Sequence, residues 1–524
     1  MPGVEQAQVG SWKSGQAVAI ADSSVDAETV SRTVEKAGYR AVVLERRPLE
    51  GGRQVPSGGE QFDLMILGGG SASFAAAIKA AELGAKVAIV EKGTIGGTCV
   101  NIGCVPSKTL IKAAELCYHA AYPKFEGLTA CPPPSDWRRV VQQKDELVAT
   151  LREHKYVHVA EQYPNITILR GQGVLTGRRG LAVDGRAYSP GKILIATGSH
   201  PWAPPIPGLK EAGYLNSTDA LSLSALPDSM MIVGGGVIGL EFAQLFARFG
   251  VRVMLFEPQP HLVAAEEPEI GTAITRYLED EKVRVCTKAI IQRVEHKDGK
   301  YMVHALLDGK EEVCTASELM VATGRRANTA DLGLEVAGVK TGPKGEIVVN
   351  EHLQTANPDV YAAGDCVGDP MLVYVAAYAG GLAAENALNG AGRVYDLFAL
   401  PRVTFTDPQI ASVGLTEEQA RAQGNRIKIA VLDLNNVPRA LAARDTRGLI
   451  KLIAEEDTGR LLGAHVLAAD AGDVIQEATL AIRFRLTIQD ITETFHPYLT
   501  MVEGLKLAAL TFNKDVAKLS CCAA

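Results

Sequence analysis

Long hydrophobic runs are missing from this chain of 524 residues, and Met1–Gly10 has no charged-then-apolar leader pattern. Basic runs are missing as well, and the formal net charge at pH 7 is -7. The first absence excludes a membrane-spanning protein, and the second argues against nucleic acid as the main partner. We therefore expect a cytoplasmic protein that acts on a small molecule or on another protein.

Cysteine is scarce, with nine in the chain and none before Cys99. The thiol pool of the cytoplasm keeps most cysteines reduced, so closely spaced pairs there are better interpreted as catalytic or metal-binding. Two such pairs are present, Cys99 with Cys104 and Cys521 with Cys522. Adjacent Cα atoms lie about 3.8 Å apart, whereas an ordinary disulfide spans roughly 4.4 to 6.8 Å. The terminal pair therefore suits a soft metal ion or a transient exchange partner.

The chain contains two copies of a strand, a glycine turn, a helix and a second strand. The first copy begins at Asp63, with its helix ending at Leu83, and the second begins at Met230, with its helix ending at Phe249. In both copies the first glycine precedes an acidic residue by 23 positions (68 to 91 and 234 to 257). One such motif also fits an ordinary strand-to-helix turn, but two with the same offset predict two dinucleotide sites. The residues expected to bind are Gly68, Gly70, Ser73 (in place of a third glycine) and Glu91 in the first copy, and Gly234, Gly236, Gly239 and Glu257 in the second.

Two further apolar strands end alike, at 195–198 and at 321–324, both with Ala-Thr-Gly after the apolar residue. We expect chain crossings between domains at these two points. After about residue 400 the pattern changes to strands at 403–405, 427–432 and 449–453 and helices at 474–485 and 501–513, which predicts a separate α/β domain. Its amphipathic surfaces are candidates for a subunit interface.

The pair Cys99 and Cys104 lies at the expected start of a helix, where the helix N-terminus lowers a thiol pKa and favours the reactive thiolate. Two cysteines at this spacing can close a small redox-active disulfide. Lys108 follows Cys104 by one helical turn, so its charge can stabilise the thiolate and an electron-rich cofactor ring. A structural metal site is the alternative, although no second pair or histidine lies nearby at ligand spacing.

This redox segment, the two dinucleotide motifs and the run Tyr361-Ala-Ala-Gly364-Asp365 resemble the class I flavoprotein pyridine nucleotide-disulfide oxidoreductases over residues 61–524. The resemblance implies an α/β fold with two Rossmann-like domains, one for FAD and one for NAD(P), and a C-terminal α+β dimerisation domain. It also implies a homodimer whose C-terminal domain completes the partner's active site. The expected divisions are a linker at 49–60, an FAD-binding domain at 61–205 and 328–399, an NAD(P)-binding domain at 206–327, and the dimerisation domain at 400–524.

By this resemblance Cys104 is the charge-transfer thiol beside the flavin, Cys99 is the outer attacking thiol, and Glu241 pairs with Lys108. Further residues expected to contact FAD are Glu91, Gly93, Thr98, Lys108, Val174, Asp365 and Val373.

The C-terminal end decides the expected substrate. Disulfide-reducing members have a glutamate that orients a histidine base, but here His496 is followed by Met501 where that glutamate is expected, which weakens general-base assistance. The run 497–506 and the tail at 519–522 resemble instead the mercuric ion reductase branch. That resemblance implies that Cys521 and Cys522 of one subunit pass Hg(II) to Cys99 and Cys104 of the other, with Tyr156 and Tyr498 along the metal path. NAD(P)H would then reduce Hg(II) to Hg(0) through FAD.

Two alternative functions stay open. One is a thioredoxin-reductase-like or lipoamide-dehydrogenase-like disulfide reductase, and the other is a protein that only sequesters a thiophilic metal ion. The choice between NADPH and NADH also stays open. The resemblance favours NADPH, but Glu257 is an acid that suits the free ribose of NADH, and Gln259 and His261 stand where an arginine could bind the 2′-phosphate of NADPH.

Residues 1–48 resemble the latter part of a ferredoxin-like heavy-metal-associated domain. The Gly-Met-Thr-Cys-x-x-Cys loop of such domains is absent. We therefore expect either a chain that begins inside such a domain or a remnant of one, and in both cases a segment that does not bind metal tightly.

Overall fold

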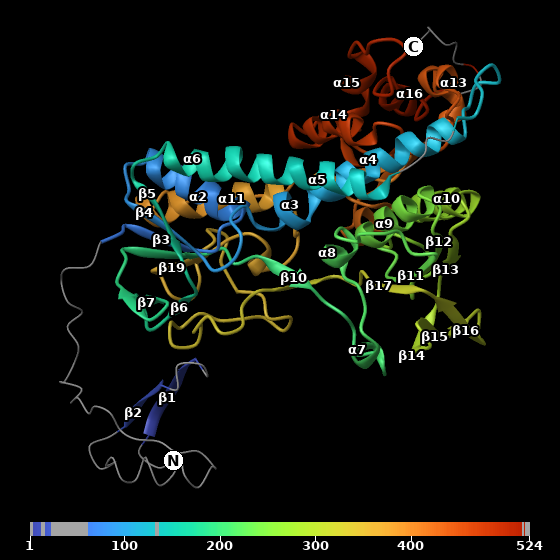
Figure 1. The fold of residues 1–524 in the computed structure, drawn as a ribbon. Helices are drawn as coiled ribbons and strands as arrows, with labels where there is room; N and C mark the ends of the chain where they lie inside the picture. The colour runs from blue at the N-terminus through green and yellow to red at the C-terminus, as the bar shows by residue number, and fades with distance from the viewer. Residues whose placement is uncertain (1–3, 12–15, 22–60, 132–135, 516–517, 519–524) are drawn as a thin grey trace. The chain divides into compact units, whose positions relative to one another are not determined.

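The computed structural model describes residues 4–11, 16–21, 61–131, 136–515 and 518 (Figure 1). It forms two compact units, Met1–Gly59 and Glu60–Ala524. In the first unit, strand β1 (Val4–Ser11) pairs antiparallel with β2 (Gln16–Ala21). Most of the expected metal-domain remnant and linker, and both Cys521 and Cys522, lie outside the described residues.

The first copy of the repeated pattern forms a parallel five-stranded sheet in the order β19-β9-β3-β4-β5. Alternate residues of β3 enter two different cores, as the two-residue period of a strand requires. Leu64 and Ile66 pack with helices α2 and α11, whereas Met65 and Leu67 pack with a three-stranded antiparallel sheet, β6-β7-β8. The bounds are β3 Leu64–Leu67, α2 Ser71–Glu82, β4 Val87–Glu91, β5 Ile166–Arg170, β6 Gly173–Leu175, β7 Leu181–Val183, β8 Arg186–Tyr188, β9 Lys192–Ile195, β19 Val360–Ala362 and α11 Val373–Asn389.

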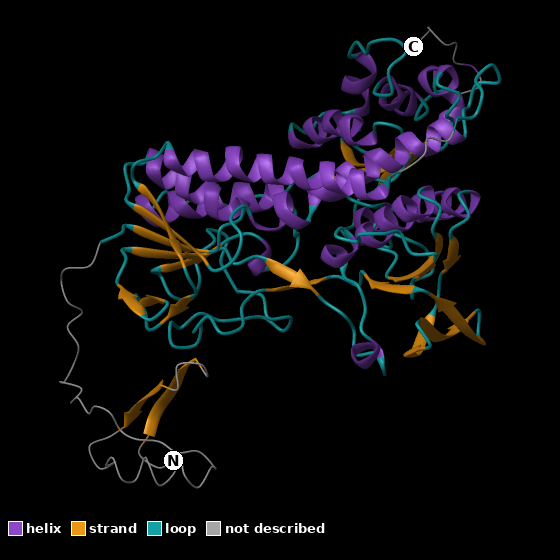
Figure 2. Ribbon diagram, in the orientation of Figure 1, coloured by secondary structure: helices purple, strands orange, loops and turns teal. Residues whose placement is uncertain are grey.

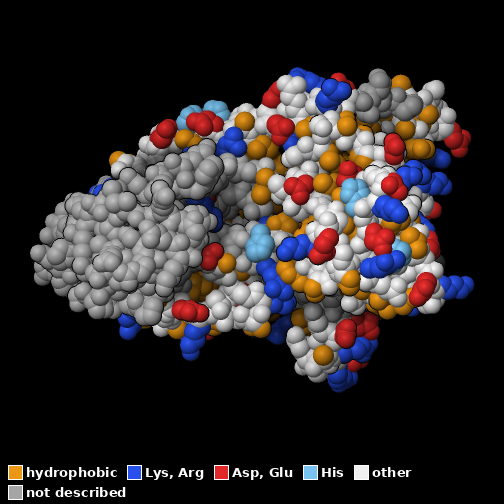
Figure 3. Space-filling model, turned by 60° about the horizontal axis from the view of Figure 1, so that its bottom comes forward, with side chains coloured by type: hydrophobic (Ala, Val, Ile, Leu, Met, Phe, Trp, Pro, Cys, Tyr) orange, Lys and Arg blue, Asp and Glu red, His pale blue; other side chains and the backbone are white. Residues whose placement is uncertain are grey.

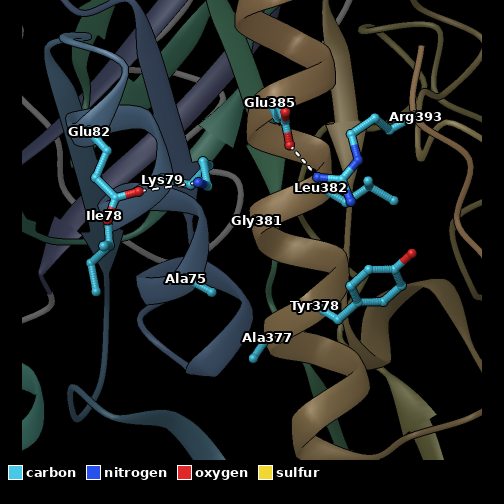
Figure 4. Close-up of a pocket in the computed structure, with 10 residues that line it drawn as sticks. All are labelled: Ala75, Ile78, Lys79, Glu82, Ala377, Tyr378, Gly381, Leu382, Glu385 and Arg393. Carbon is cyan, nitrogen blue, oxygen red and sulfur yellow. Dashed lines mark hydrogen bonds and ion pairs between the residues drawn. The ribbon is translucent and has the colours of Figure 1, made fainter. Parts of the chain in front are cut away.

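Helices α2 and α11 pack closely because small residues line their contact. A Cβ on Gly380 would lie 2.0 Å from the carbonyl oxygen of Ala72, so only glycine fits there. The outer side of this contact forms an open hollow of about 410 Å³, where Tyr378 and the ion pair of Arg393 with Glu385 (2.6 Å) lie (Figure 4).

The second copy repeats this architecture with a parallel sheet in the order β13-β12-β11-β17. Met230 and Ile232 pack with α9 and α10, and Met231 and Val233 pack with the antiparallel sheet β14-β15-β16. In each copy the long helices lie on one face of the strands (Figure 2). The bounds are β11 Ser229–Val233, α9 Val237–Arg248, β12 Arg252–Phe256, α10 Pro268–Asp280, β13 Arg284–Cys286, β14 Ile290–Lys297, β15 Lys300–Leu307, β16 Lys310–Ala316 and β17 Glu318–Val321.

The two expected crossings are present and pair with each other. Strands β10 (Ser199–Pro201) and β18 (Arg325–Ala327) follow the two Ala-Thr-Gly sequences and form an antiparallel ribbon. Two short helices, α7 (Leu209–Ala212) and α8 (Ser217–Ala220), lie between β10 and the second copy.

Among the described residues between β4 and β5, five segments are helical. Helices α4 and α5 pack against each other, and both contact α3. The bounds are α3 Gly97–Ile102, α4 Cys104–Ala121, α5 Trp137–Arg152, the π-helical turn η1 Glu153–Val157 and α6 His158–Glu161. The redox cysteines therefore belong to the first two segments of this insertion.

The C-terminal domain is an antiparallel sheet in the order β20-β21-β24-β23-β22 with helices packed against it. The three expected strands and two expected helices are present with shifted ends, and two strands and three short helices are additional. The bounds are β20 Arg402–Thr404, β21 Gln409–Gly414, α12 Glu417–Ala422, β22 Ile427–Asp433, α13 Pro438–Ala442, β23 Leu449–Glu455, β24 Leu461–Ala468, α14 Ala471–Arg483, α15 Ile488–Glu493 and α16 Glu503–Leu510.

Acidic and basic side chains are intermingled over the described part of the face in Figure 3. Among the described residues, none of the helices combines the length and the apolar character that a membrane span requires.

Candidate redox active site

The two cysteines of the redox segment lie on consecutive helices. Cys99 is half-buried in α3, Cys104 is exposed as the first residue of α4, and neither is bridged. Gly103 separates the helices, and a Cβ at that position would lie 2.9 Å from the carbonyl oxygen of Thr98. The glycine break thus allows the two thiols to come together.

The pKa values of the two thiols are shifted in opposite directions. A hydrogen bond from Cys99 lowers the pKa of Cys104 to about 6. The charge of Lys108 acts in the same direction, and the partial burial of the Cys104 thiol and the charge of Glu241 act against it. The same hydrogen bond and burial raise the pKa of Cys99. These opposite shifts favour the thiolate form at Cys104 and the thiol form at Cys99. The roles of attacking and charge-transfer thiol that the resemblance implies stay a prediction.

Lys108 lies one helical turn after Cys104 and has two partners. Its Nζ donates a hydrogen bond of 2.7 Å to Oε2 of Glu241, whose side chain is 3% exposed, so the expected pairing is present. The same Nζ lies 4.8 Å from the ring centroid of Phe405, whose backbone N–H donates to Glu241 Oε1 at 2.9 Å. No motif in the sequence indicated that Phe405 lies at this site.

Tyr156 lies beside the cysteine pair, on the π-helical turn η1. Its hydroxyl is 3.4 Å from Ser71 Oγ, and its ring packs edge-on against Phe74 at 4.9 Å. Burial raises the pKa of Tyr156, and negative charge on either thiol raises it further. Tyr498, the second tyrosine expected along the metal path, lies in the C-terminal domain and is 50% exposed.

The first dinucleotide motif forms a cradle that fits FAD. Gly68 has φ +108, and a Cβ there would lie 2.3 Å from the carbonyl oxygen of Ala196. A Cβ on Gly97 would lie 2.5 Å from Gly70 Cα, so the N-termini of α2 and α3 approach each other only through glycines. Neither helix has a side-chain cap or an acidic residue in its first turn, which leaves backbone N–H groups for a pyrophosphate.

The other residues expected at this cradle lie around it. Glu91 ends β4 and accepts a hydrogen bond of 2.6 Å from the N–H of Gly93. Ser73 is fully buried in α2, and its Oγ has no hydrogen-bond partner among the described residues. Thr98 lies in α3, Val174 in β6 and Val373 at the start of α11.

Asp365 is held by two residues that follow the domain crossings. Its Oδ2 accepts a hydrogen bond of 2.6 Å from Ser199 Oγ, which in turn accepts one of 2.8 Å from Arg325. The repeated Ala-Thr-Gly sequences predicted the crossings but not the bond between Ser199 and Asp365. These two residues are 166 positions apart, and neither Ala-Thr-Gly sequence indicates which distant residue its strand contacts.

The second motif fits a nicotinamide dinucleotide in the same way. Gly234 has φ +111, Gly236 faces open space, and a Cβ on Gly239 would lie 1.8 Å from the carbonyl oxygen of Gly234. Helix α9 also begins without a side-chain cap or a first-turn acid. Glu257 is 8% exposed and accepts hydrogen bonds from the N–H groups of Gly235 (2.7 Å) and Gln259 (2.8 Å).

His496 has a carboxylate partner, although Met501 stands where the glutamate was expected. Its Nε2 lies 2.7 Å from Oε1 of Glu477 on α14, and this hydrogen bond raises the pKa of His496. Met501, at the position where the glutamate was expected, is 7% exposed in the core of the C-terminal domain. The carboxylate comes from another helix, which the spacing along the chain does not reveal.

The hollow in Figure 4 lies away from the redox site, because none of the expected redox residues line it. A larger hollow of about 860 Å³ is lined by residues of both the second copy and the C-terminal domain, with Met371 and Leu372 just before α11.

Comparisons with known proteins agree with this architecture. The model of the pyridine nucleotide-disulphide oxidoreductase family matches residues 62–380, and that of its dimerisation domain matches residues 400–509. The chain is similar to the mercuric reductases of Staphylococcus aureus (46% identity, 95% of this chain, 90% of that one) and Streptomyces lividans (51% identity, 88% and 98%).

Among solved structures, the chain resembles the Cu(II) complex of the HOCl-induced flavoprotein disulfide reductase RclA from Escherichia coli. The identity is 31%, the TM-score is 0.78, and the match covers 87% of this chain and all (100%) of that one.

Proposed function

The chain belongs to the pyridine nucleotide-disulphide oxidoreductases, and from that membership we propose that it is a mercuric reductase active in mercury detoxification. It reduces Hg(II) to volatile Hg(0) with electrons from NAD(P)H through FAD. The observation that carries the proposal is the neighbouring pair of Cys99 and Cys104, with their pKa values shifted in opposite directions, beside a glycine cradle that fits FAD. The likeness to mercuric reductases at 46% and 51% identity distinguishes Hg(II) from a disulfide as the substrate.

The residues of the site suit this reaction. FAD, when bound, accepts two electrons from NAD(P)H and passes them on to the metal. The soft sulfur of Cys104 binds Hg(II) as a thiolate, and Cys99 releases its thiol proton when it becomes the second ligand. Lys108 places a positive charge near Cys104, and Glu241 balances it in a partly buried ion pair. When Hg(0) leaves, Cys99 recovers its proton.

The active site is proposed to be shared between the subunits of a homodimer. Cys521 and Cys522 of one subunit capture Hg(II) and transfer it by thiolate exchange to Cys99 and Cys104 of the other, so the metal is never released to water. Tyr156 and Tyr498 line this path. The domain divisions expected from the sequence, the remnant at residues 1–48 and a cytoplasmic location complete the proposal.

The assay that tests this function follows oxidation of NADPH and of NADH by the purified yellow protein. The acceptors are Hg(II) in excess small thiol and, separately, oxidised thioredoxin, lipoamide and glutathione. We expect oxidation with Hg(II) and evolution of mercury vapour. Turnover with a disulfide and none with Hg(II) would contradict the proposal, and the ratio of the two nicotinamide rates decides the preferred cofactor.

The tail makes a separate prediction. Replacing both Cys521 and Cys522 by alanine should impair turnover of thiol-bound Hg(II) and leave the reduction of FAD by NAD(P)H intact, because only the transfer step loses its ligands. Steady-state kinetics and rapid-mixing flavin absorbance separate these two steps. Cys131→Ala, which removes an exposed cysteine outside the pair, is the matched control. Unchanged turnover in the double variant would rule out the transfer.

One observation favours disulfide reduction as a second candidate activity. His496 with Glu477 is a histidine oriented by a carboxylate, which is the arrangement that protonates a leaving thiolate. The disulfide acceptors in the assay above test this candidate directly.

A further inference from the structure

Three residues from distant parts of the chain form a closed cycle of contacts at the redox site. Lys108 Nζ binds Glu241 Oε2 at 2.7 Å, Glu241 Oε1 accepts the N–H of Phe405 at 2.9 Å, and the ring of Phe405 faces Lys108 Nζ at 4.8 Å. Helix α4 supplies the lysine, helix α9 of the second copy the glutamate, and the C-terminal domain the phenylalanine. Each residue thus restricts the other two.

Phe405 is held firmly because its segment is bound along one face of α9. Gln244, one turn after Glu241, bonds Asp407 twice through its amide, accepting from Asp407 N at 2.8 Å and donating to its carbonyl oxygen at 2.9 Å. Arg248, a further turn along, donates to Asp407 Oδ2 at 2.8 Å. The spacing of three and four residues places all three α9 side chains on one face.

Lys108 needs such a constraint because a lysine ammonium is a mobile, strongly hydrated charge on a flexible stem. Its side chain is 29% exposed. The bond to Glu241 alone fixes the position of one N–H group and leaves the ammonium group free to reorient around it. An aromatic face attracts the ammonium and excludes water from one side of it. The second contact fixes the direction in which the charge points.

We propose that Phe405 is a positioning residue, whose ring holds the Lys108 ammonium against Glu241 and keeps its charge beside the redox centre. The inference rests on the proposed function only in taking Cys99 and Cys104 as the site of metal reduction. It gives the C-terminal domain a direct contact with the redox lysine of its own subunit.

The test replaces Phe405 by leucine, which retains apolar bulk and removes the aromatic face. In the holoprotein, labelling of Lys108 by an amine reagent, followed by peptide mass spectrometry, should become about two- to fivefold faster, as loss of one cation–π contact implies. The kcat for Hg(II)-dependent NADPH oxidation should fall by a similar factor, with KM for NADPH unchanged. Phe405→Tyr should restore both values, since the ring face is retained.

Phe125→Leu is the matched control, because Phe125 also faces a cation, Arg444, at 5.9 Å and is 48% exposed. It should leave Lys108 labelling and kcat unchanged. Wild-type labelling in Phe405→Leu, or a tyrosine variant as impaired as the leucine variant, would overturn the positioning role. If the wild type reduces no Hg(II), the proposed function fails, but the labelling rates still decide the role of Phe405.

Discussion

Replacing Cys104 by serine should abolish Hg(II) reduction, lowering kcat by at least about 10³-fold, because a hydroxyl supplies neither a thiolate nor a soft ligand at neutral pH. Reduction of FAD by NADPH should persist, since the glycine cradle and α9 are unchanged. Hg(II)-dependent NADPH oxidation and anaerobic flavin bleaching measure the two steps. Cys131→Ser controls for the loss of an exposed thiol. A serine variant that still turns over Hg(II) would remove Cys104 from the mechanism.

The pH dependence of the wild type should follow from the same thiolate. With the pKa of Cys104 lowered to about 6, the thiolate is present above this pH, and Hg(II) turnover should fall as the pH drops through it. The hydrogen bond from Cys99 is the largest cause of this lowering, so Cys99→Ala should move the ionisation of Cys104 to higher pH. The long-wavelength absorbance of a thiolate beside the flavin provides the measurement.

The parts of the fold that local sequence determines could be predicted. The strand, glycine turn and helix of each copy follow one another within about 25 residues, and the first acid was placed at the end of β4 where the structure has it. Strands β21 and β24 were missed because both contain glycine and alanine, which have low β-propensity, although each pairs with the strand just before it. Helices α12, α13 and α15 have five or six residues, too few for a helical period to be recognised.

The candidate site shows the same limit. Cys99, Cys104, Lys108 and Glu241 lie in recognisable motifs, but Phe405 was expected only as the end of a strand. Strand β20 in fact stops at Thr404, which frees the N–H of Phe405 to bond Glu241. A contact between residues 164 positions apart leaves no periodic signal in the sequence.

Replacing Arg248 by methionine should destabilise the protein by about 3 to 5 kcal/mol at neutral pH, because it removes the cation that pairs with buried Glu281 and one of the cations that pair with Asp407. The guanidinium, 2% exposed, binds Glu281 through two hydrogen bonds of 2.7 Å and also reaches Asp407. Arg284 is the matched control, since it binds Glu312 with the same two-bond geometry at 50% and 40% exposure. Arg284→Met should cost less than about 1 kcal/mol. Guanidinium unfolding midpoints of both variants provide the comparison.

The destabilisation by Arg248→Met should also depend on pH. Burial works to raise the pKa of Asp407, but a hydrogen bond from His119 and the charges of Arg447 and Arg248 outweigh it and hold that pKa well below its usual range. A carboxyl group with a depressed folded pKa stabilises the fold above its unfolded pKa of about 3.9, and this contribution disappears as the pH falls through the folded value. Arg248→Met lacks one of the charges that depress the pKa of Asp407, so ionised Asp407 stabilises this variant less and acid removes less stability from it. The difference between wild type and Arg248→Met should therefore be largest near neutrality and narrow below about pH 4, whereas a difference that stays constant into acid would exclude Asp407 as its source.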